Sequence, residues 1–176
     1  SLLEGLRIPR ALELACAEGH FTQLLADAVE HLDARDISAK ALERAAERCA
    51  AKTNISYAQH DFFNEPIEPA FDLIVCSEVL YYTNDRALMD SIAAKIAGAL
   101  APGGYVLSAH ANLLSDNPAR TGFDWDHPFG AQGIFDSFEQ AGDLVPVAAI
   151  ETELYSIRLM QRRADVAEGA QPRIQR

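Results

Sequence analysis

A run of small residues bounded by acids is the first feature of the sequence that could bind a ligand. The run is Glu13-Leu14-Ala15-Cys16-Ala17-Glu18-Gly19, and Asp36 follows Glu13 at close to the roughly 20-residue interval of dinucleotide-type sites. Backbone N–H groups at the start of a helix lack acceptors, and small residues let a ligand approach them. An acid after the second strand accepts hydrogen bonds from ribose hydroxyls. The pattern predicts a site for a ribose-containing ligand.

A second group of candidates follows two later apolar runs. Ser77 and Glu78 precede Tyr81 and Tyr82, and His110 ends the next run. Carboxylate and phenol oxygens can hold an amine, an aromatic face suits a cationic centre, and a histidine can act as a general base. Structural roles fit as well: the tyrosines could pack against a helix, Glu78 could favour a helix start, and His110 could be a core residue.

The loop over residues 123–129 combines aromatic and acidic side chains. Such a mixture suits sugar recognition, with Trp125 as a stacking platform. In the alternative, structural interpretation, Asp126 caps the following helix and Trp125 fills the core. Asp124, Asp126 and His127 resemble metal ligands, but nothing else in the chain completes a site, so we predict no metal.

The elements that must position these residues alternate along the chain. Residues 71–76 form a continuous, β-rich apolar run, typical of a parallel strand buried on both faces. Apolar residues at helical spacing follow Gly19, with Phe21, Leu24, Leu25 and Ala28 on one face. Ser38 is a natural N-cap for the next helix, whose buried stripe is Leu42, Ala45, Ala46 and Cys49. We expect strands at 10–16, 31–37, 55–60, 71–76 and 105–110, and helices at 19–28, 38–49 and 85–100, the last burying Leu88, Ile92, Ile96 and Leu100.

The last third has a different pattern. A turn at Pro102-Gly103-Gly104 leads into the fifth strand, and residues 112–129 are loop-like. A helix over 129–142, with Ile134, Phe135 and Phe138, precedes strands at 144–152 and 154–161, which must be antiparallel because a tight turn joins them. We therefore predict an α/β fold: a Rossmann-like three-layer αβα sandwich with a mostly parallel seven-stranded sheet and an antiparallel C-terminal strand. Residues 1–163 form one domain, and 164–176 form a disordered tail.

Composition narrows the class of protein. The chain has 176 residues, 15 basic against 26 acidic, and a formal net charge of −11, which disfavours binding to nucleic acid. No apolar run approaches the roughly 20 residues that span a bilayer, and residues 1–10 lack the apolar core of a secretory signal. Cys16, Cys49 and Cys76 are far apart and lie in apolar runs, so we expect buried thiols in a reducing compartment. We expect a cytoplasmic protein, monomeric or homodimeric, without a membrane partner.

Several segments together resemble the class I S-adenosylmethionine methyltransferases. The matching segments are Glu13 to Gly19, Asp36-Ile37-Ser38, Asp61-Phe62, Phe71 to Ile74, and Leu100 to Gly104. Glu78-Val79-Leu80-Tyr81-Tyr82 is similar to the nodulation protein S-like methyltransferases, whose best-known members N-methylate an amino sugar of a chito-oligosaccharide. The resemblance implies S-adenosylmethionine as cofactor, S-adenosylhomocysteine as product, and methyl transfer to nitrogen or oxygen of a small-molecule acceptor.

The resemblance also implies roles for individual residues. Glu13 would lie near the methionine end of the cofactor, and Asp36 would take the ribose hydroxyls. Ile37 would pack on the adenine, and Asp61 would accept from its amino group. The other implied cofactor residues are Ala15, Cys16, Ala17 and Gly19 through their backbones, Ser38, Phe62 and Phe63 beside the ring, and Ser77 and Glu78 near the methionine part. Glu78, Tyr81, Tyr82 and His110 would surround the acceptor.

The sequence departs from the family pattern at two places. Ala15 and Ala17 stand where the family carries glycines, and alanine tolerates positive φ poorly. A degenerate, non-catalytic module that binds a partner is therefore an alternative; a nicotinamide-dependent oxidoreductase is a weaker one, because the loop lacks G-x-G-x-x-G. Seven residues precede Ile8, whereas members of this class carry helices there, so we expect part of the acceptor pocket to lie outside this sequence.

Overall fold

The computed structural model describes residues 2–164, and its centre is one seven-stranded sheet in the order β3-β2-β1-β4-β5-β7-β6. The expected tail covers residues 164–176 and lies, apart from Ala164, outside the described range. The strands are β1 (Arg10–Leu14), β2 (His31–Asp36), β3 (Ile55–Gln59), β4 (Phe71–Ser77), β5 (Leu100–Ala111), β6 (Leu144–Glu151) and β7 (Tyr155–Arg162). The helices are α1 (Thr22–Leu25), α2 (Ala39–Arg48), the 3₁₀ turn η1 (Leu80–Thr83), α3 (Arg86–Ala99) and α4 (Ala131–Gln140).

The strand pairing confirms the predicted fold. β1 runs parallel to both β2 and β4, and β4 runs parallel to β5. β7 runs antiparallel to β5 on one side and to β6 on the other. The strand order reverses between β1 and β4, and in such sheets ligands bind beyond the carboxyl ends of the strands at that point.

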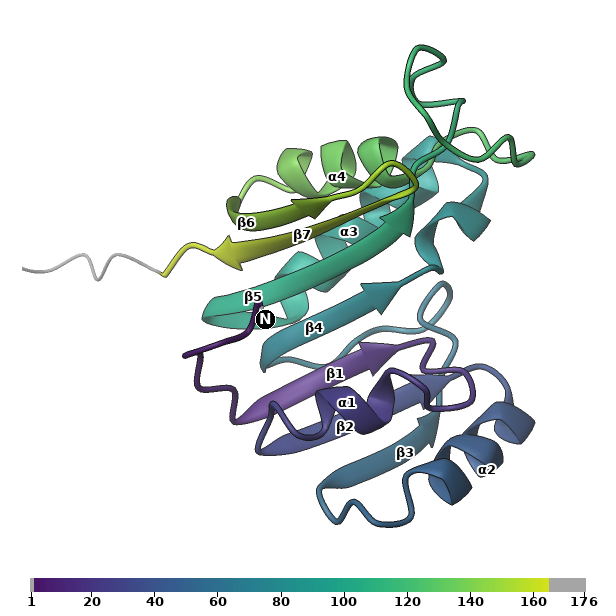
Figure 1. Ribbon diagram of the computed structural model, residues 1–176. Helices are drawn as coiled ribbons and strands as arrows, with labels where there is room; N and C mark the ends of the chain where they lie inside the picture. The colour runs from purple at the N-terminus through teal and green to yellow at the C-terminus, as the bar shows by residue number, and fades with distance from the viewer. Residues whose placement is uncertain (1, 165–176) are drawn as a thin grey trace, which may run out of the picture.

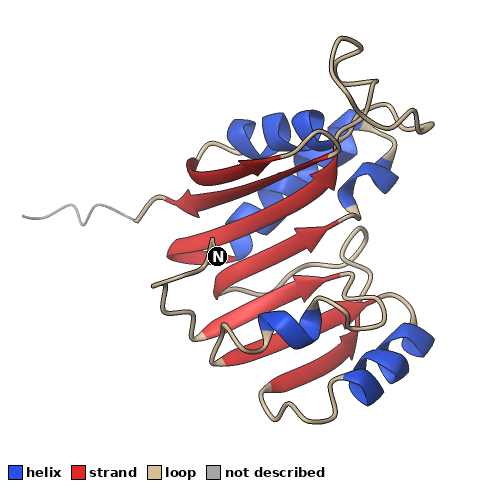
Figure 2. Cartoon of the chain, viewed as in Figure 1, coloured by secondary structure: helices blue, strands red, loops and turns tan. Residues whose placement is uncertain are grey.

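Helices cover both faces of the sheet, as Figures 1 and 2 show. α1 and α2 lie on the near face in Figure 1, where Leu25 and Leu42 pack onto alternate residues of β2. α3 and α4 lie on the far face, where Ile92 and Phe138 belong to the larger core cluster. Burial on both faces explains why β4 is apolar throughout its centre.

The helix after Gly19 is α1, which is shorter than the predicted range of 19–28. The predicted buried stripe of this helix is also wrong. Phe21 and Leu24 are 39% and 62% exposed, and Leu25 is the buried member of the stripe. The reason is a long-range cap: the Asn54 amide donates to the carbonyl oxygens of Ala26 and Val29 at 2.8 and 3.1 Å. These bonds satisfy carbonyl groups at the helix end, so the chain turns there.

One further boundary and one buried residue differ from the prediction. β5 begins at Leu100 and continues through the expected Pro-Gly-Gly turn, with a shift of register opposite Phe71 and Leu73. Gly104 makes this possible, because a Cβ there would lie 2.8 Å from the Phe71 carbonyl oxygen. In α3, Leu88 is 40% exposed and Met89 is buried instead. The α2 and α4 stripes are confirmed at Leu42, Ala45, Ile134 and Phe138.

Candidate functional site

The loop after β1 keeps a glycine-type backbone although two of its residues are alanines. Ala15 and Ala17 have φ of 58° and 48°, and Gly19 has φ of 79°. The left-handed conformation that glycines allow is therefore present at Ala15 and Ala17 as well, where the Cβ atom of each alanine makes it sterically unfavourable. A Cβ on Gly19 would lie 2.9 Å from the Cα of Ala45, so this glycine also sets the approach of α2.

Asp36 fastens this loop from the end of β2. One carboxylate oxygen accepts from the Ala17 N–H at 2.9 Å, and the other accepts from the Ser38 N–H at 2.8 Å. Ser38 in turn caps α2, since its hydroxyl accepts from the Ala41 N–H at 3.2 Å, as predicted. A carboxylate oxygen can accept two hydrogen bonds, so Asp36 retains acceptor capacity toward a ligand.

Glu13 is a buried acid at the end of β1. Glu13 is only 4% exposed, and its Oε2 atom is buried without a hydrogen-bond partner in the described chain. Burial raises the pKa of Glu13 to about 7. A buried carboxyl oxygen without a hydrogen-bond partner is costly, and a cation or N–H donor from a ligand would relieve that cost.

A cleft of about 70 Å³ lies beside Asp36 at the carboxyl ends of the strands. It is lined by Ala15, Asp36, Ile37, His60, Asp61, Phe62, Phe63 and Val79. The lining is mainly apolar, and the Phe62 and Phe63 ring centroids lie 4.4 Å apart. The structure therefore brings predicted cofactor residues from three segments to one cleft whose walls suit a flat ring.

Other predicted cofactor residues lie beside this cleft. The Cys16 side chain is buried beneath α2 in a cluster with Ala34 and Leu42, so it can face a ligand with its backbone alone. Ser77 is half-buried at the end of β4. The sequence prediction missed His60 and Val79; the position of His60 immediately before Asp61 is the signal that could have indicated it.

Glu78 and Tyr81 form a pair at the carboxyl end of β4. The Tyr81 hydroxyl donates to Oε2 of Glu78 at 3.1 Å, while Oε1 of Glu78 is buried without a partner among residues 2–164. Burial raises the pKa of Glu78 and, together with the neighbouring carboxylate, raises that of Tyr81. Glu78 itself has φ of 55°, an uncommon conformation for a non-glycine residue.

His110 lies in the core at the end of β5, as the structural alternative predicted. It is fully buried, and burial lowers its pKa to about 3. Its Nε2 accepts from the Leu80 N–H at 3.3 Å, so Nδ1 carries the proton and donates to the Ser108 hydroxyl at 3.1 Å. His110 thereby contacts the start of η1, the turn that carries Tyr81.

Aromatic rings continue from Tyr81 into the 112–129 loop, which extends beyond the carboxyl end of β5 (Figure 1). The Tyr81 ring lies 5.9 Å from Trp125 and 5.1 Å from His127. Trp125 is 39% exposed and Tyr82 is 59% exposed. The expectation that Trp125 fills the core is wrong, because this partly exposed residue stacks on Phe123 with ring centroids 4.5 Å apart.

The cap of α4 also comes from an unexpected residue. The helix begins after Gly130, and the Asp116 carboxylate accepts from the N–H groups of Gly130, Gln132 and Gly133 at 3.0, 3.0 and 3.3 Å. Asp126 therefore does not cap this helix. Asp116 ties the start of the long loop to its end, which holds the aromatic segment over the site.

Three other sequence predictions concern the cysteines, a metal site and membrane-spanning helices. All three cysteines are free and buried, as expected. Among residues 2–164, no group of three or more His, Cys, Asp or Glu side chains is arranged to hold a metal ion. No helix in that part of the chain combines the length and apolar character needed to cross a bilayer.

Comparisons with known proteins agree with this geometry. The family model described as Nodulation protein S (NodS) matches residues 2–159. Nodulation protein S of Rhizobium tropici is 36% identical over 134 residues, which are 76% of this chain and 53% of the relative. The Sinorhizobium fredii (strain NBRC 101917 / NGR234) relative is 33% identical over 134 residues, 76% of this chain and 59% of its own length. The chain thus spans just over half the length of these curated relatives.

A solved structure shows the same fold. The N-methyltransferase NodS from Bradyrhizobium japonicum WM9, in complex with S-adenosyl-L-homocysteine, is similar with a TM-score of 0.76 and 27% sequence identity. The match covers 89% of this chain and 79% of that one.

Proposed function

Because the chain belongs to the nodulation protein S (NodS) family, we propose that it is an S-adenosylmethionine-dependent N-methyltransferase domain with a small-molecule acceptor. The observation that carries the proposal is the apolar cleft beside Asp36 at the carboxyl ends of the strands. The related protein that holds S-adenosylhomocysteine supports the choice of cofactor. When bound, S-adenosylmethionine supplies an electrophilic methyl group on a sulfonium.

Residues that line the cleft fit the adenosine part of this cofactor, and Glu13, at the end of β1, fits the methionine part. Asp36 has acceptor capacity left for the ribose hydroxyls, and Ile37, Phe62 and Phe63 would flank the adenine. Glu13 would accept from the ammonium group of the methionine part, which would supply the missing partner of its Oε2 atom. On binding, the buried carboxyl oxygen of Glu13 would gain a charge-assisted hydrogen bond.

Glu78 is the residue that we propose to receive the acceptor amine. A protonated amine must lose a proton before its nitrogen has a lone pair with which to attack the methyl group, and the unpaired Oε1 atom of Glu78 can take that proton. The raised pKa of Glu78 favours this transfer, and Tyr81 fixes the carboxylate by donating to Oε2. His110 positions both through the backbone of Leu80.

We further propose an amino sugar or oligosaccharide as the acceptor. The partly exposed rings of Tyr82 and Trp125 contact the Tyr81 ring of the Glu78–Tyr81 pair, and exposed aromatic rings are suited to pack against sugar rings. Labelled cofactor with a glucosamine oligomer and its fully N-acetylated analogue would test this directly. Label is expected in the free amine alone; equal labelling of both would overturn the assignment of the nitrogen.

Calorimetry with S-adenosylmethionine, S-adenosylhomocysteine and NAD tests the cofactor. Asp36→Ala should weaken binding of both sulfur ligands by at least about a hundredfold, because charged hydrogen bonds contribute roughly 1.5–3 kcal/mol each. Asp27→Ala, an exposed acid bonded to Lys52, is the matched control and should bind like the parent. Circular dichroism checks that both variants fold.

The outcomes separate the alternatives. Binding of neither sulfur ligand by the parent would overturn the methyltransferase proposal and favour a non-catalytic module. Binding of NAD instead would favour an oxidoreductase. Unchanged affinity in Asp36→Ala would show that the cofactor lies elsewhere.

A further inference from the structure

One lysine on the far face of the sheet reaches the segment that forms a wall of the cleft. Lys95 lies on α3, and its ammonium group donates to the carbonyl oxygens of Phe62, Phe63 and Glu65 at 2.8, 3.2 and 2.9 Å. An ammonium group has three N–H donors, so these contacts use all of them. In the described chain this ammonium is bonded to carbonyl groups and to no carboxylate.

The carbonyl groups that Lys95 contacts belong to an isolated helical turn. The N–H groups of Asn64 and Glu65 both donate to the Asp61 carbonyl oxygen, at 3.0 and 2.7 Å. Asp61 also closes the start of the turn, since its carboxylate accepts from the Phe63 N–H at 3.2 Å. A single turn leaves its last carbonyl groups without helical partners, and a cation is favourable at that end.

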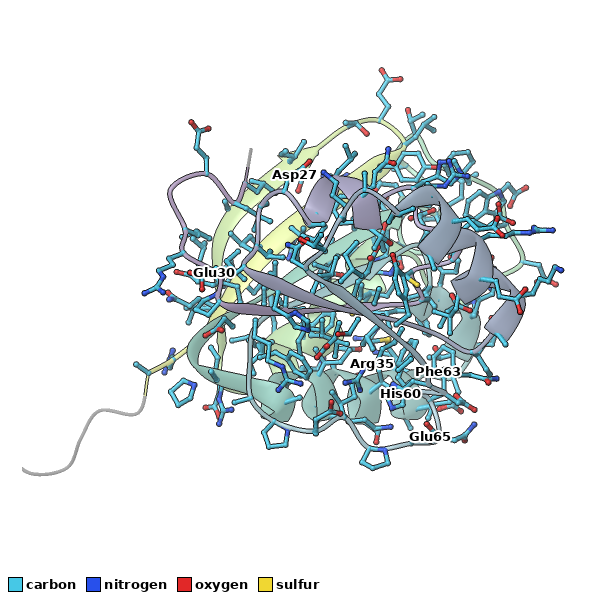
Figure 3. All side chains as sticks on the ribbon, turned by 90° about the horizontal axis from the view of Figure 1, so that it is seen from below. Asp27, Glu30, Arg35, His60, Phe63 and Glu65 are labelled. Atoms are coloured by element: carbon cyan, nitrogen blue, oxygen red, sulfur yellow. The ribbon has the colours of Figure 1, made fainter. Side chains whose placement is uncertain are left out.

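Residues of the same turn also line the cleft. Asp61, Phe62 and Phe63 line the cleft, whereas Phe62 also packs in the core cluster that contains Ile92 and Ile96 of α3. His60 braces the segment further along, where its Nε2 donates to the Pro66 carbonyl oxygen at 3.0 Å; His60, Phe63 and Glu65 lie near one another in Figure 3. The position of the cleft wall therefore depends on Lys95, which does not line the cleft, and on the hydrogen bond of His60 to Pro66.

We propose that Lys95 is a positioning residue for the adenine side of the cofactor site. This inference rests on the proposed function, because it assumes that the cleft holds the adenine. Lys95 holds the three carbonyl groups without lining the cleft itself, and thereby keeps the Asp61 carboxylate and the Phe63 ring in place at the cofactor. Without the ammonium the turn loses its end cap, and the binding-competent arrangement is populated less.

The test uses Lys95→Met, which keeps the length of the side chain and removes all three donors. Calorimetry measures the affinities for S-adenosylhomocysteine and for 5′-methylthioadenosine, which carries the adenosine part without the amino acid. Both affinities are expected to fall by the same factor, about tenfold, equivalent to roughly one charged hydrogen bond. In the methyl-transfer assay KM for the cofactor should rise while kcat at saturating cofactor stays within about twofold.

Two variants serve as controls. Lys52→Met makes the same change at a lysine that is bonded to Asp27 and lies outside the cleft, so its affinities should match the parent. Lys95→Arg keeps the charge and several donors and should recover most of the lost affinity. If Lys95→Met does not fold, Lys95→Gln, with one amide group in place of the ammonium, replaces it and should show an intermediate loss.

The results distinguish this inference from the proposed function. Parent-like affinity in Lys95→Met would overturn the inference alone. A loss for S-adenosylhomocysteine without a loss for methylthioadenosine would overturn it too, because the effect would lie at the methionine end. A parent that binds neither ligand would instead overturn the proposed function and this inference with it.

Discussion

Replacing Ala17 with glycine should stabilise the protein, against the usual effect of an Ala→Gly change. Ala17 has φ of 48°, and a left-handed conformation costs a residue with a Cβ roughly 1–2 kcal/mol. Glycine removes that cost but increases the entropy of the unfolded chain, which offsets about 0.5–1 kcal/mol. Ala17 is exposed, so little packing is lost, and its N–H still donates to Asp36.

The expected net gain is therefore about 0.5–1 kcal/mol in the free energy of unfolding. For a chain of this size that corresponds to a rise in Tm of about 1–4 °C. Urea denaturation at one pH, with the parent alongside, measures the change through the midpoint at constant slope.

The control is Ala94→Gly, at an exposed position in the interior of α3. Ala94 is not among the residues with positive φ, so this variant should lose about 0.5–1 kcal/mol. The two changes thus have opposite predicted signs. Destabilisation of Ala17→Gly by as much as the control would refute the argument that the loop stores backbone strain. Ala15→Gly should gain less than Ala17→Gly, because the Ala15 methyl group packs against the core cluster.

Two further predictions concern the same loop. Glu13 has a pKa raised to about 7 by burial, so the native state holds its proton more tightly than the unfolded state and loses stability as pH rises from about 4.5 through 7. Glu13→Gln should therefore exceed the parent in stability at pH 8, by up to about 3 kcal/mol, and match it at pH 4.5; an equal difference at both pH values would contradict the assignment to Glu13. Gly19→Ala should destabilise the protein by about 2 kcal/mol or more, since its Cβ would lie 2.9 Å from the Ala45 backbone. Thermal melts against Gly98→Ala, where a Cβ meets open space, would test this, and equal melting temperatures would refute it.

The sequence by itself determined the features that depend on local order. Alternating apolar runs and helical periods predicted the seven strands and the layers around them, because each period specifies which face of an element is buried. The small-residue loop and the acids at strand ends predicted the cleft, since the carboxyl ends of parallel strands meet at one edge of the sheet. Asp36 follows from that rule, whereas the family resemblance implied Ala15, Phe62 and Phe63, which line the same cleft.

The tertiary structure decided which side chains are buried and which groups they hydrogen-bond, because both depend on residues far apart in the chain. His110 and Trp125 were both ambiguous in the sequence, and packing placed one in the core and the other at the surface. Asp116 caps a helix that begins after Gly130, and Lys95 caps a turn around Phe62. No local pattern indicates such contacts, because a side chain finds its hydrogen-bond partners only after the sheet has brought distant segments together.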